Sequence, residues 1–504
     1  MINYNFKSKI LKVNKFNIKT NGIQLIENDD NVEIRVDVFR SQPVFLFKDS
    51  NKIIHVFDHM EYFYKNEIIP KEIDEIGFWE IMLFGNSLWT RTLYNNLFQL
   101  PSASSLLIDK QTLCFSINRY WDFNVYEDKS ILNIDFAAQK LNEKLNELAL
   151  KLEPNKDYIL GLSGGMDSRI TLGYLSKHLK RENIKTFTYA HTKTSLEYNY
   201  SKEICDRLNL KEPDFHLLDS SSYLNALGYM PKKSGGQIGI NHCHIIDYLS
   251  RSKIGSQTYV STYFSDAVFG WECESELTVE EKLMNPFLSK LSDITFLNDN
   301  IKKRIKKDAH FLTKDYDINS NISSLREYIY ISERNQKFHN YLFSIQTDYV
   351  NDAKCFYHDY DLFTYSLSIP IRFRSRKKLE YFIVNKYFNE ICSSKIGDIS
   401  SNYFRPKNEI KSVTKYLKFK FLNRLNALLR VITQGNIQID NIFQTEELER
   451  NLYKFFKKDL NKSFDYFYKK GLFDKRHAFL KKLPIKSTGV NERYRIISLA
   501  TLFK

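Results

Sequence analysis

The chain has 504 residues, 43% of them apolar and 15% aromatic, which suffices for two or three domains with hydrophobic cores and argues against disorder. No run of about 18 uncharged apolar residues occurs, so no membrane-spanning helix is expected, and the lysine-rich N-terminus lacks the apolar segment of a signal peptide. Six scattered cysteines without CxxC spacing disfavour a zinc site or a disulfide framework and predict a cytoplasmic protein.

The positive charge is concentrated at one end of the chain. The 74 Lys and Arg residues exceed the 60 Asp and Glu residues by 14, and residues 401–504 alone carry 23 basic against 9 acidic side chains. A basic surface attracts nucleic acid, an anionic membrane or an acidic substrate, but lysines also form the solvated face of many helices. We expect the second case, with no specific binding of nucleic acid. Aromatic residues at helical spacing in this tail predict packing against the preceding domain.

The first part of the chain, up to about residue 123, predicts short strands. Segments 32–39, 43–47 and 52–58 alternate or run apolar at strand length and are separated by polar turns. Only residues 75–84 show a helical period in this part. At 133–152 apolar residues recur at intervals of three and four, which predicts a helix and a domain boundary.

The segment after that boundary alternates between strand and helix patterns. Residues 158–162 and 184–190 predict strands, and residues 170–179 and 196–208 predict helices. This alternation is typical of a parallel sheet with crossover helices. Beyond residue 277 the pattern is mostly helical.

A glycine-rich loop, SGGMDS, follows the first of these strands and precedes a helix. The N-terminus of a helix offers unpaired N–H groups to an anion, and Gly164 and Gly165 allow the backbone to approach it closely. Ser163 and Ser168 add hydroxyl donors, and Asp167 suits a metal ion. The loop is neither a Walker loop, since it has no lysine, nor a dinucleotide fingerprint. The remaining alternative is a tight turn without a ligand.

These residues resemble the pyrophosphate loop of the ATP pyrophosphatases, which include asparagine synthetase, GMP synthetase and tRNA-modifying ligases. Residues 259–271, with Ser265-Asp266 before Phe269-Gly270, are similar to the second motif of asparagine synthetases. Residues 353–370, with Asp359 and Pro370, resemble a later segment of that family. Residues 90–109 and 119–123 look like the end of its glutaminase domain. All four segments occur in the family's order.

The resemblance implies a fold of three parts. An α+β N-terminal domain at 1–125 would be a degenerate class II glutamine amidotransferase domain with an Ntn-hydrolase-like sandwich. An α/β domain at 130–400 would hold the parallel sheet of an ATP pyrophosphatase. Residues 401–504 would form a basic, helical C-terminal extension of the synthetase domain.

The resemblance also implies a reaction. The enzyme would be a carbon–nitrogen ligase that uses ATP and Mg²⁺ to form an amide bond through an acyl-adenylate, releasing AMP and pyrophosphate. Asp167 and Asp266 would be the catalytic metal ligands, although Asp266 could instead be a helix N-cap. The implied nucleotide site consists of Leu162, Ser163, Gly164, Gly165, Asp167, Ser168, Tyr189, Ser261 and Thr262. The substrates would be a small-molecule or peptide carboxylate and an amine donor.

The sequence departs from the family at informative places. Glutaminases of this family use an N-terminal cysteine, whereas residue 2 here is Ile2 and the first cysteine is Cys114. We therefore expect no glutaminase activity, as in β-lactam synthetases and lasso peptide cyclases. Tyr263 stands where asparagine synthetases carry a glutamate between two glycines, which Thr262 and Phe264 replace, so aspartate is not the expected substrate.

Three questions stay open at this point. The family's catalytic lysine falls on Ser401 in the best register, with Lys395, Lys407 and Lys411 as nearby alternatives. The sequence HCH at 242–244 contains metal-ligand residue types, but its spacing disfavours a metal site, because residues two apart do not share a helix face. The rival functions are a catalytically inactive partner protein of the same fold, acting with a protein of its pathway, and a tRNA-modifying ATP pyrophosphatase.

Overall fold

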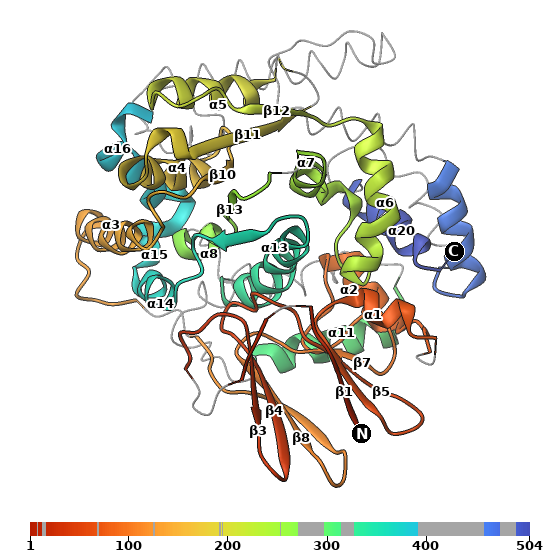
Figure 1. Cartoon of the computed structure of the whole chain (residues 1–504). Helices are drawn as coiled ribbons and strands as arrows, with labels where there is room; N and C mark the ends of the chain where they lie inside the picture. The colour runs from red at the N-terminus through yellow and green to blue at the C-terminus, as the bar shows by residue number, and fades with distance from the viewer. Residues whose placement is uncertain are drawn as a thin grey trace.

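A computed structural model describes residues 1–7, 9–12, 17–67, 70–123, 127–190, 193, 195–252, 254–270, 297–313, 327–391, 458–473 and 490–503. The protein is a mixed α/β structure with two sheets in its N-terminal part, a parallel sheet after them and helices near its C-terminus (Figure 1). Within these residues, no helix combines the length and apolarity needed to span a bilayer.

The N-terminal part is a sandwich of two sheets. The first has the order β1-β6-β5-β7 and the second the order β2-β3-β4-β8-β9. Their bounds are β1(Ile2–Asn5), β2(Ile10–Lys12), β3(Ile23–Glu27), β4(Asn31–Val36), β5(Phe45–Lys48), β6(Ile54–Phe57), β7(Leu97–Gln99), β8(Ser104–Asp109) and β9(Phe115–Arg119). Val32, Ile34 and Val36 of β4 pack with Leu46 of β5 and Val56 of β6 in one core. The sandwich agrees with the expected shape, while its kinship to Ntn hydrolases stays a prediction.

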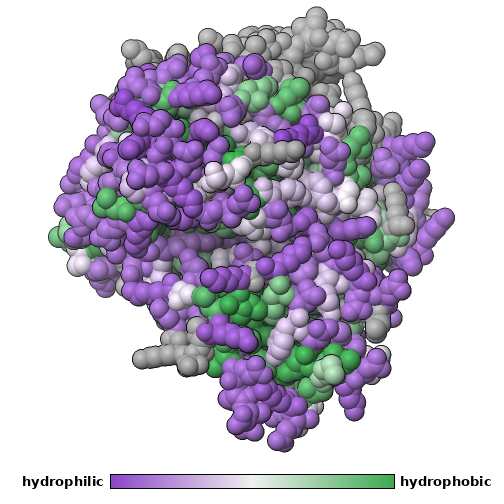
Figure 2. Space-filling model, in the orientation of Figure 1, coloured by the Kyte–Doolittle hydropathy of each residue, from purple (hydrophilic) through white to green (hydrophobic). Residues whose placement is uncertain are grey.

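Two helices lie between β6 and β7 in the chain, α1(Met60–Lys65) and α2(Glu75–Phe84). The bounds of α2 confirm the helix expected at 75–84, because Asp74 caps its start by accepting from Gly77 N and Gly85 ends it at φ 91°. In Figure 2 apolar surface shows over the N-terminal sheets, and the surface over the parallel-sheet domain is mainly hydrophilic.

The central sheet is wholly parallel, with the order β12-β11-β10-β13-β14. Its strands are β10(Tyr158–Gly161), β11(Ile184–Ala190), β12(Asp214–Leu217), β13(Thr258–Ser261) and β14(Asp352–Cys355). The chain extends the sheet in one direction from β10 to β12 and then in the other from β13 to β14. In such sheets ligands bind outside the carboxyl ends of the strands where the order reverses, which here is between β10 and β13.

Helices cover both faces of this sheet. Tyr158 and Leu160 face the core formed with α3, α4 and α16, whereas Ile159 packs with Tyr248 of α7 and Phe343 of α13 on the opposite face. The helices of this domain are α3(Ile134–Leu150), α4(Met166–His178), η1(Arg181–Asn183), α5(Leu196–Arg207), α6(Ser220–Ser234), η2(Ile240–His242), α7(His244–Ser252), α8(Ser265–Phe269), α14(Tyr360–Ser368), α15(Ile371–Arg374), η4(Ser375–Lys377), α16(Lys378–Tyr387) and η5(Asn389–Ile391).

A continuous helical segment lies between the N-terminal sandwich and the central sheet (Figure 1). Its described part begins as α-helix at 327–329, becomes the π-helix η3(Tyr330–His339) and continues as α13(Asn340–Thr347). Its polar side chains bind N-terminal loops: Gln336 donates to Val38 O at 2.7 Å, and the buried Lys337 donates to Trp89 O at 2.6 Å. This segment therefore joins the two domains through buried hydrogen bonds.

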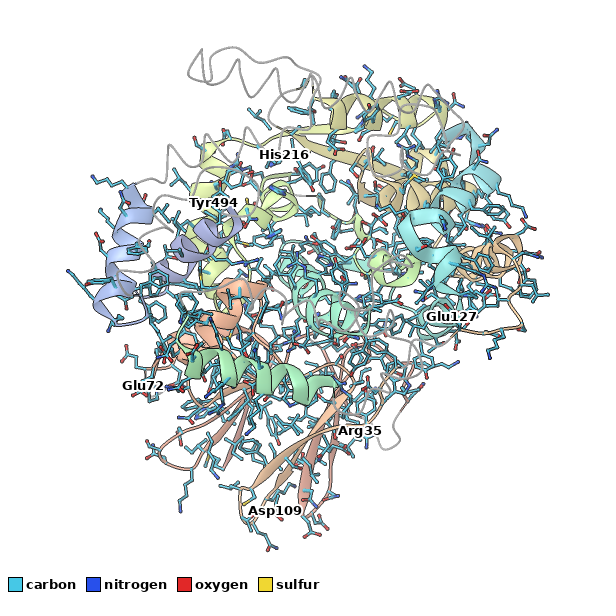
Figure 3. The ribbon with its side chains drawn as sticks, turned by 180° about the vertical axis from the view of Figure 1, so that it is seen from behind. Arg35, Glu72, Asp109, Glu127, His216 and Tyr494 are labelled. Atoms are coloured by element: carbon cyan, nitrogen blue, oxygen red, sulfur yellow. The ribbon has the colours of Figure 1, made fainter. Side chains whose placement is uncertain are left out.

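The remaining described helices pack on the N-terminal part. Seen from behind, α11(Asp299–Thr313) crosses the N-terminal domain beside the labelled Glu72 (Figure 3), and Asp308 pairs with Arg91 at 2.7 Å. The C-terminal residues form a helix over 458–469 and α20(Val490–Thr501). Phe467 and Phe473 pack against Phe78 of α2. Helix α20 packs on α6 and η2, as expected, and also on α2, so the described part of the tail contacts both the parallel-sheet part and the N-terminal part.

Candidate active site

The glycine-rich loop leaves β10 at the point where the strand order reverses and enters α4 directly. Leu162 is buried, its N–H donates to Phe187 O at 2.8 Å, and its carbonyl accepts from Thr188 Oγ1 at 2.8 Å and Ser201 Oγ at 3.0 Å. The backbone of Leu162 therefore anchors the loop to β11 and α5, and its side chain belongs to the core rather than to the open face of the loop.

The two predicted serines lie together. Ser163 N donates to Ser168 Oγ at 3.1 Å, and the two hydroxyl oxygens are also 3.1 Å apart. Gly165 N donates to Ser163 Oγ at 3.1 Å, and Gly165 itself caps α4, with Asp167 in the first turn. Hydroxyl groups and the amino end of a helix thus meet within six residues, as anion binding requires.

The middle of the loop already holds an anion, the carboxylate of Glu197 on α5. Gly164 N donates to Glu197 Oε2 at 2.7 Å, while the buried Arg169 donates to Gly164 O at 3.0 Å and to Ile391 O at 3.1 Å. Both polar groups of the Gly164 backbone are therefore fixed by side chains. Because Gly164 N already binds a carboxylate oxygen, the loop is able to bind an anion. No pattern in the sequence indicates that Glu197 lies here.

The second wall of the site is the turn after β13. Ser261 is buried, and its hydroxyl accepts from Tyr263 N at 3.2 Å. Thr262 O accepts from Ser265 N at 3.3 Å, and Phe264 has φ 73° and ψ −4°, a left-handed conformation that costs a bulky residue about 1–2 kcal/mol. Helix α8 begins at Ser265, so Asp266 lies in its first turn and is not the N-cap. The N-cap alternative is wrong.

Glu380 of α16 connects the two walls. Its carboxyl group is fully buried and contacts that of Asp167, and burial, followed by the charges of Asp167 and Asp266, raises the pKa of Glu380 well above its usual value. Lys377 Nζ lies 3.8 Å from Glu380 Oε2. Glu380 therefore lies between Asp167 and Lys377, and Asp266 is near enough to act on it electrostatically. A glutamate within an amphipathic helix carries no distinguishing signal in the sequence, so neither Glu380 nor Lys377 was expected here.

The acidic side chains fit a hard divalent cation. Asp167 Oδ1 is buried and, apart from the Glu380 carboxyl, has no hydrogen-bond partner in the described part of the chain. No group of three or more His, Cys, Asp or Glu residues within the described ranges is arranged to hold a metal alone. Magnesium, however, is commonly bound by one or two carboxylates together with substrate phosphates. Asp167 and Asp266 as the two carboxylate ligands of such a site stay a prediction.

Aromatic rings line the strand ends beside the turn. Tyr189 stacks on His244 with ring centroids 5.0 Å apart, and Tyr263 stacks on His339 at 5.6 Å. Gln346 Nε2 donates to the Tyr263 hydroxyl at 3.0 Å. Burial, assisted by Arg334, lowers the pKa of His339 to about 3, so its imidazole is neutral. The surroundings of Tyr263 are thus aromatic and neutral.

The two histidines of the HCH sequence contact different rings. His242 packs edge-on against Phe338 at 4.7 Å, while His244 faces Tyr189. The register position Ser401 and its alternatives Lys395, Lys407 and Lys411 lie outside the described residues, so the identity of a catalytic lysine stays a prediction.

No protein-family model matches the chain. A segment of 47 residues is 45% identical to the NH3-dependent NAD⁺ synthetase of Thermoplasma volcanium, which is 9% of this chain and 19% of the relative. The chain is weakly homologous to that synthetase. Among solved structures, the NH3-dependent NAD synthetase of Campylobacter jejuni in complex with nitrate is 13% identical, with 40% of this chain and 97% of that chain covered and a TM-score of 0.21. The chain thus spans about a fifth of the curated relative's length.

Proposed function

We propose that this protein is an ATP-dependent carbon–nitrogen ligase of the asparagine synthase-like, AMP-forming type. The observation that carries the proposal is the pair of turns at the strand-order reversal. One turn holds a carboxylate on Gly164 N, the other carries Asp266, and Glu380 lies against Asp167 between them. The weak homology to an NAD synthetase supports a ligase that uses ATP.

The first step activates a carboxylate. A carboxylate oxygen of the substrate attacks the α-phosphorus of ATP, the bond from that phosphorus to the β-phosphate bridging oxygen breaks, and pyrophosphate leaves. Ser163, Ser168 and the loop N–H groups would donate hydrogen bonds to the departing pyrophosphate. Asp167 and Asp266 would hold Mg²⁺, which when bound neutralises phosphate charge.

The second step forms the amide. The nitrogen of an amine attacks the activated carbonyl carbon, the bond to AMP breaks, and the nitrogen releases a proton. Ile2 lies in β1, paired with Ile54, and provides no nucleophile for releasing ammonia from glutamine. The relative's name describes it as NH3-dependent. We therefore propose that free ammonia or a substrate amine reacts here, and we place the enzyme in the cytoplasm.

The test is to identify the products of ATP cleavage. Purified protein is incubated with Mg²⁺, ATP, ammonium and panels of small-molecule and peptide carboxylates. The proposal expects AMP and pyrophosphate in equal amounts, dependent on one class of carboxylate. Formation of ADP and phosphate would show a different chemistry.

A second candidate is an inactive protein that retains the fold. The left-handed Phe264 favours it, because its strain lies in the turn that carries Asp266. This candidate predicts no cleavage of ATP with any carboxylate.

A further inference from the structure

The turn that precedes Asp266 has a backbone suited to glycine but carries a phenylalanine. The hydrogen bond from Ser265 N to Thr262 O closes a four-residue turn, with Phe264 in its third position at φ 73° and ψ −4°. These are the angles of a type II turn, whose third position strongly favours glycine. Some other interaction must therefore hold Phe264 in place.

Three rings surround the Phe264 side chain, which is 1% exposed. Phe363 lies at 5.1 Å and His358 at 5.5 Å, both from the segment that follows β14. The third ring is Phe39 of the N-terminal domain, edge-on at 5.2 Å and 89°. Edge-to-face contacts of this kind are favourable. The Phe264 ring thus extends from the site into the domain interface.

Phe39 is itself held firmly. Its N–H donates to Asp37 Oδ1 at 2.8 Å, and its carbonyl accepts from Asn340 Nδ2 of α13. Its ring stacks on His358 at 4.8 Å and 9°, and His358 hydrogen-bonds Asn340 at 3.0 Å. The N-terminal domain therefore presents a fixed ring to the turn that carries Asp266.

We propose that Phe39 is a positioning residue, through which the N-terminal domain holds the Thr262–Asp266 turn in its metal-binding form. The proposal rests on the proposed function of Asp266 as a metal ligand. It assigns the domain a role in the reaction that needs no glutaminase nucleophile. If the domain were only a structural remnant, loss of the Phe39 ring would lower stability without changing the requirement for Mg²⁺.

The experiment compares Phe39→Leu with the matched control Phe47→Leu. Phe47 is buried in the same domain but packs on Phe63 and His55, away from the turn. Binding of ATP to the full-length protein is measured by calorimetry over a series of MgCl2 concentrations and in EDTA. We expect Phe39→Leu to raise the half-maximal Mg²⁺ concentration about tenfold, or about 1.4 kcal/mol, and Phe47→Leu to leave it unchanged.

Phe264→Ala and Phe264→Gly provide an independent comparison, should Phe39→Leu fail to fold. Both remove the ring, but only glycine adopts the left-handed turn without strain. Phe264→Ala should therefore raise the Mg²⁺ requirement more than Phe264→Gly. Equal requirements in Phe39→Leu and Phe47→Leu, or in the two Phe264 variants, would overturn the positioning role alone. Wild-type protein that binds ATP without dependence on Mg²⁺ would overturn the proposed function as well.

Discussion

Replacing Glu197 tests whether its carboxylate occupies the place of a phosphate oxygen. Glu197 Oε2 accepts from Gly164 N at 2.7 Å, so pyrophosphate must either displace this side chain or bind beside its negative charge. A hydrogen bond to a charged group contributes about 1.5–3 kcal/mol. Since 1.4 kcal/mol is about tenfold in affinity, Glu197→Ala should bind pyrophosphate at least about tenfold more tightly than wild type.

Calorimetric titration of Mg-pyrophosphate into both proteins measures this effect. Glu203→Ala is the matched control, because Glu203 lies on the same helix and pairs with Arg207 at 2.8 Å. Glu197→Gln should give an intermediate affinity, since an amide oxygen still accepts from Gly164 N but carries no charge. Weaker binding by Glu197→Ala would refute this reasoning and show that the carboxylate supports the loop instead of competing for it.

Three further predictions concern other parts of the chain. With Ile2 in place of a nucleophile, purified protein should release no glutamate from glutamine with or without ATP; steady release free of contaminating amidotransferases would contradict this. Residues 401–504 should bind total tRNA and an unrelated duplex equally weakly at about 50 mM salt and lose both by about 200 mM, whereas tRNA-selective binding at the higher salt would favour the tRNA-modifying alternative. Burial, partly offset by Arg91, raises the pKa of Glu80 from 4.5 to about 8. The protonated Glu80 side chain therefore contributes fully to stability below pH 4.5, and this contribution is lost as the pH rises toward 8. Glu80→Gln should thus unfold at a higher temperature than wild type at pH 8 but not at pH 4. Equal pH dependence of the two melting temperatures would contradict this prediction.

Local periodicity was sufficient to predict the elements with strong patterns. The helix capped by Asn133 and strand β11 agree closely with the segments expected at 133–152 and 184–190. Helix α4 starts four residues before the apolar period does, because Gly165 caps it. Strands β12 and β14 were missed because DFHL and DAKC are short and largely polar.

The site was predictable only where one local motif carried it. Ser163 to Ser168 are adjacent in the sequence, so their grouping could be foreseen. Glu380 reaches Asp167 from 213 positions further along the chain, and Phe39 reaches Phe264 across the domain interface. Such contacts depend on strand order and helix packing, which no local pattern encodes.

In the proposed reaction, Asp167 and Asp266 bind the metal ion on the pyrophosphate of ATP. The most direct measurement is Mg-dependent exchange of labelled pyrophosphate into ATP, with the carboxylate that supports AMP formation. Asp167→Asn and Asp266→Asn should each abolish exchange while remaining folded, and Asp361→Asn, an exposed residue paired with Lys19, should exchange like wild type. Exchange at the wild-type rate in either site variant would contradict the account.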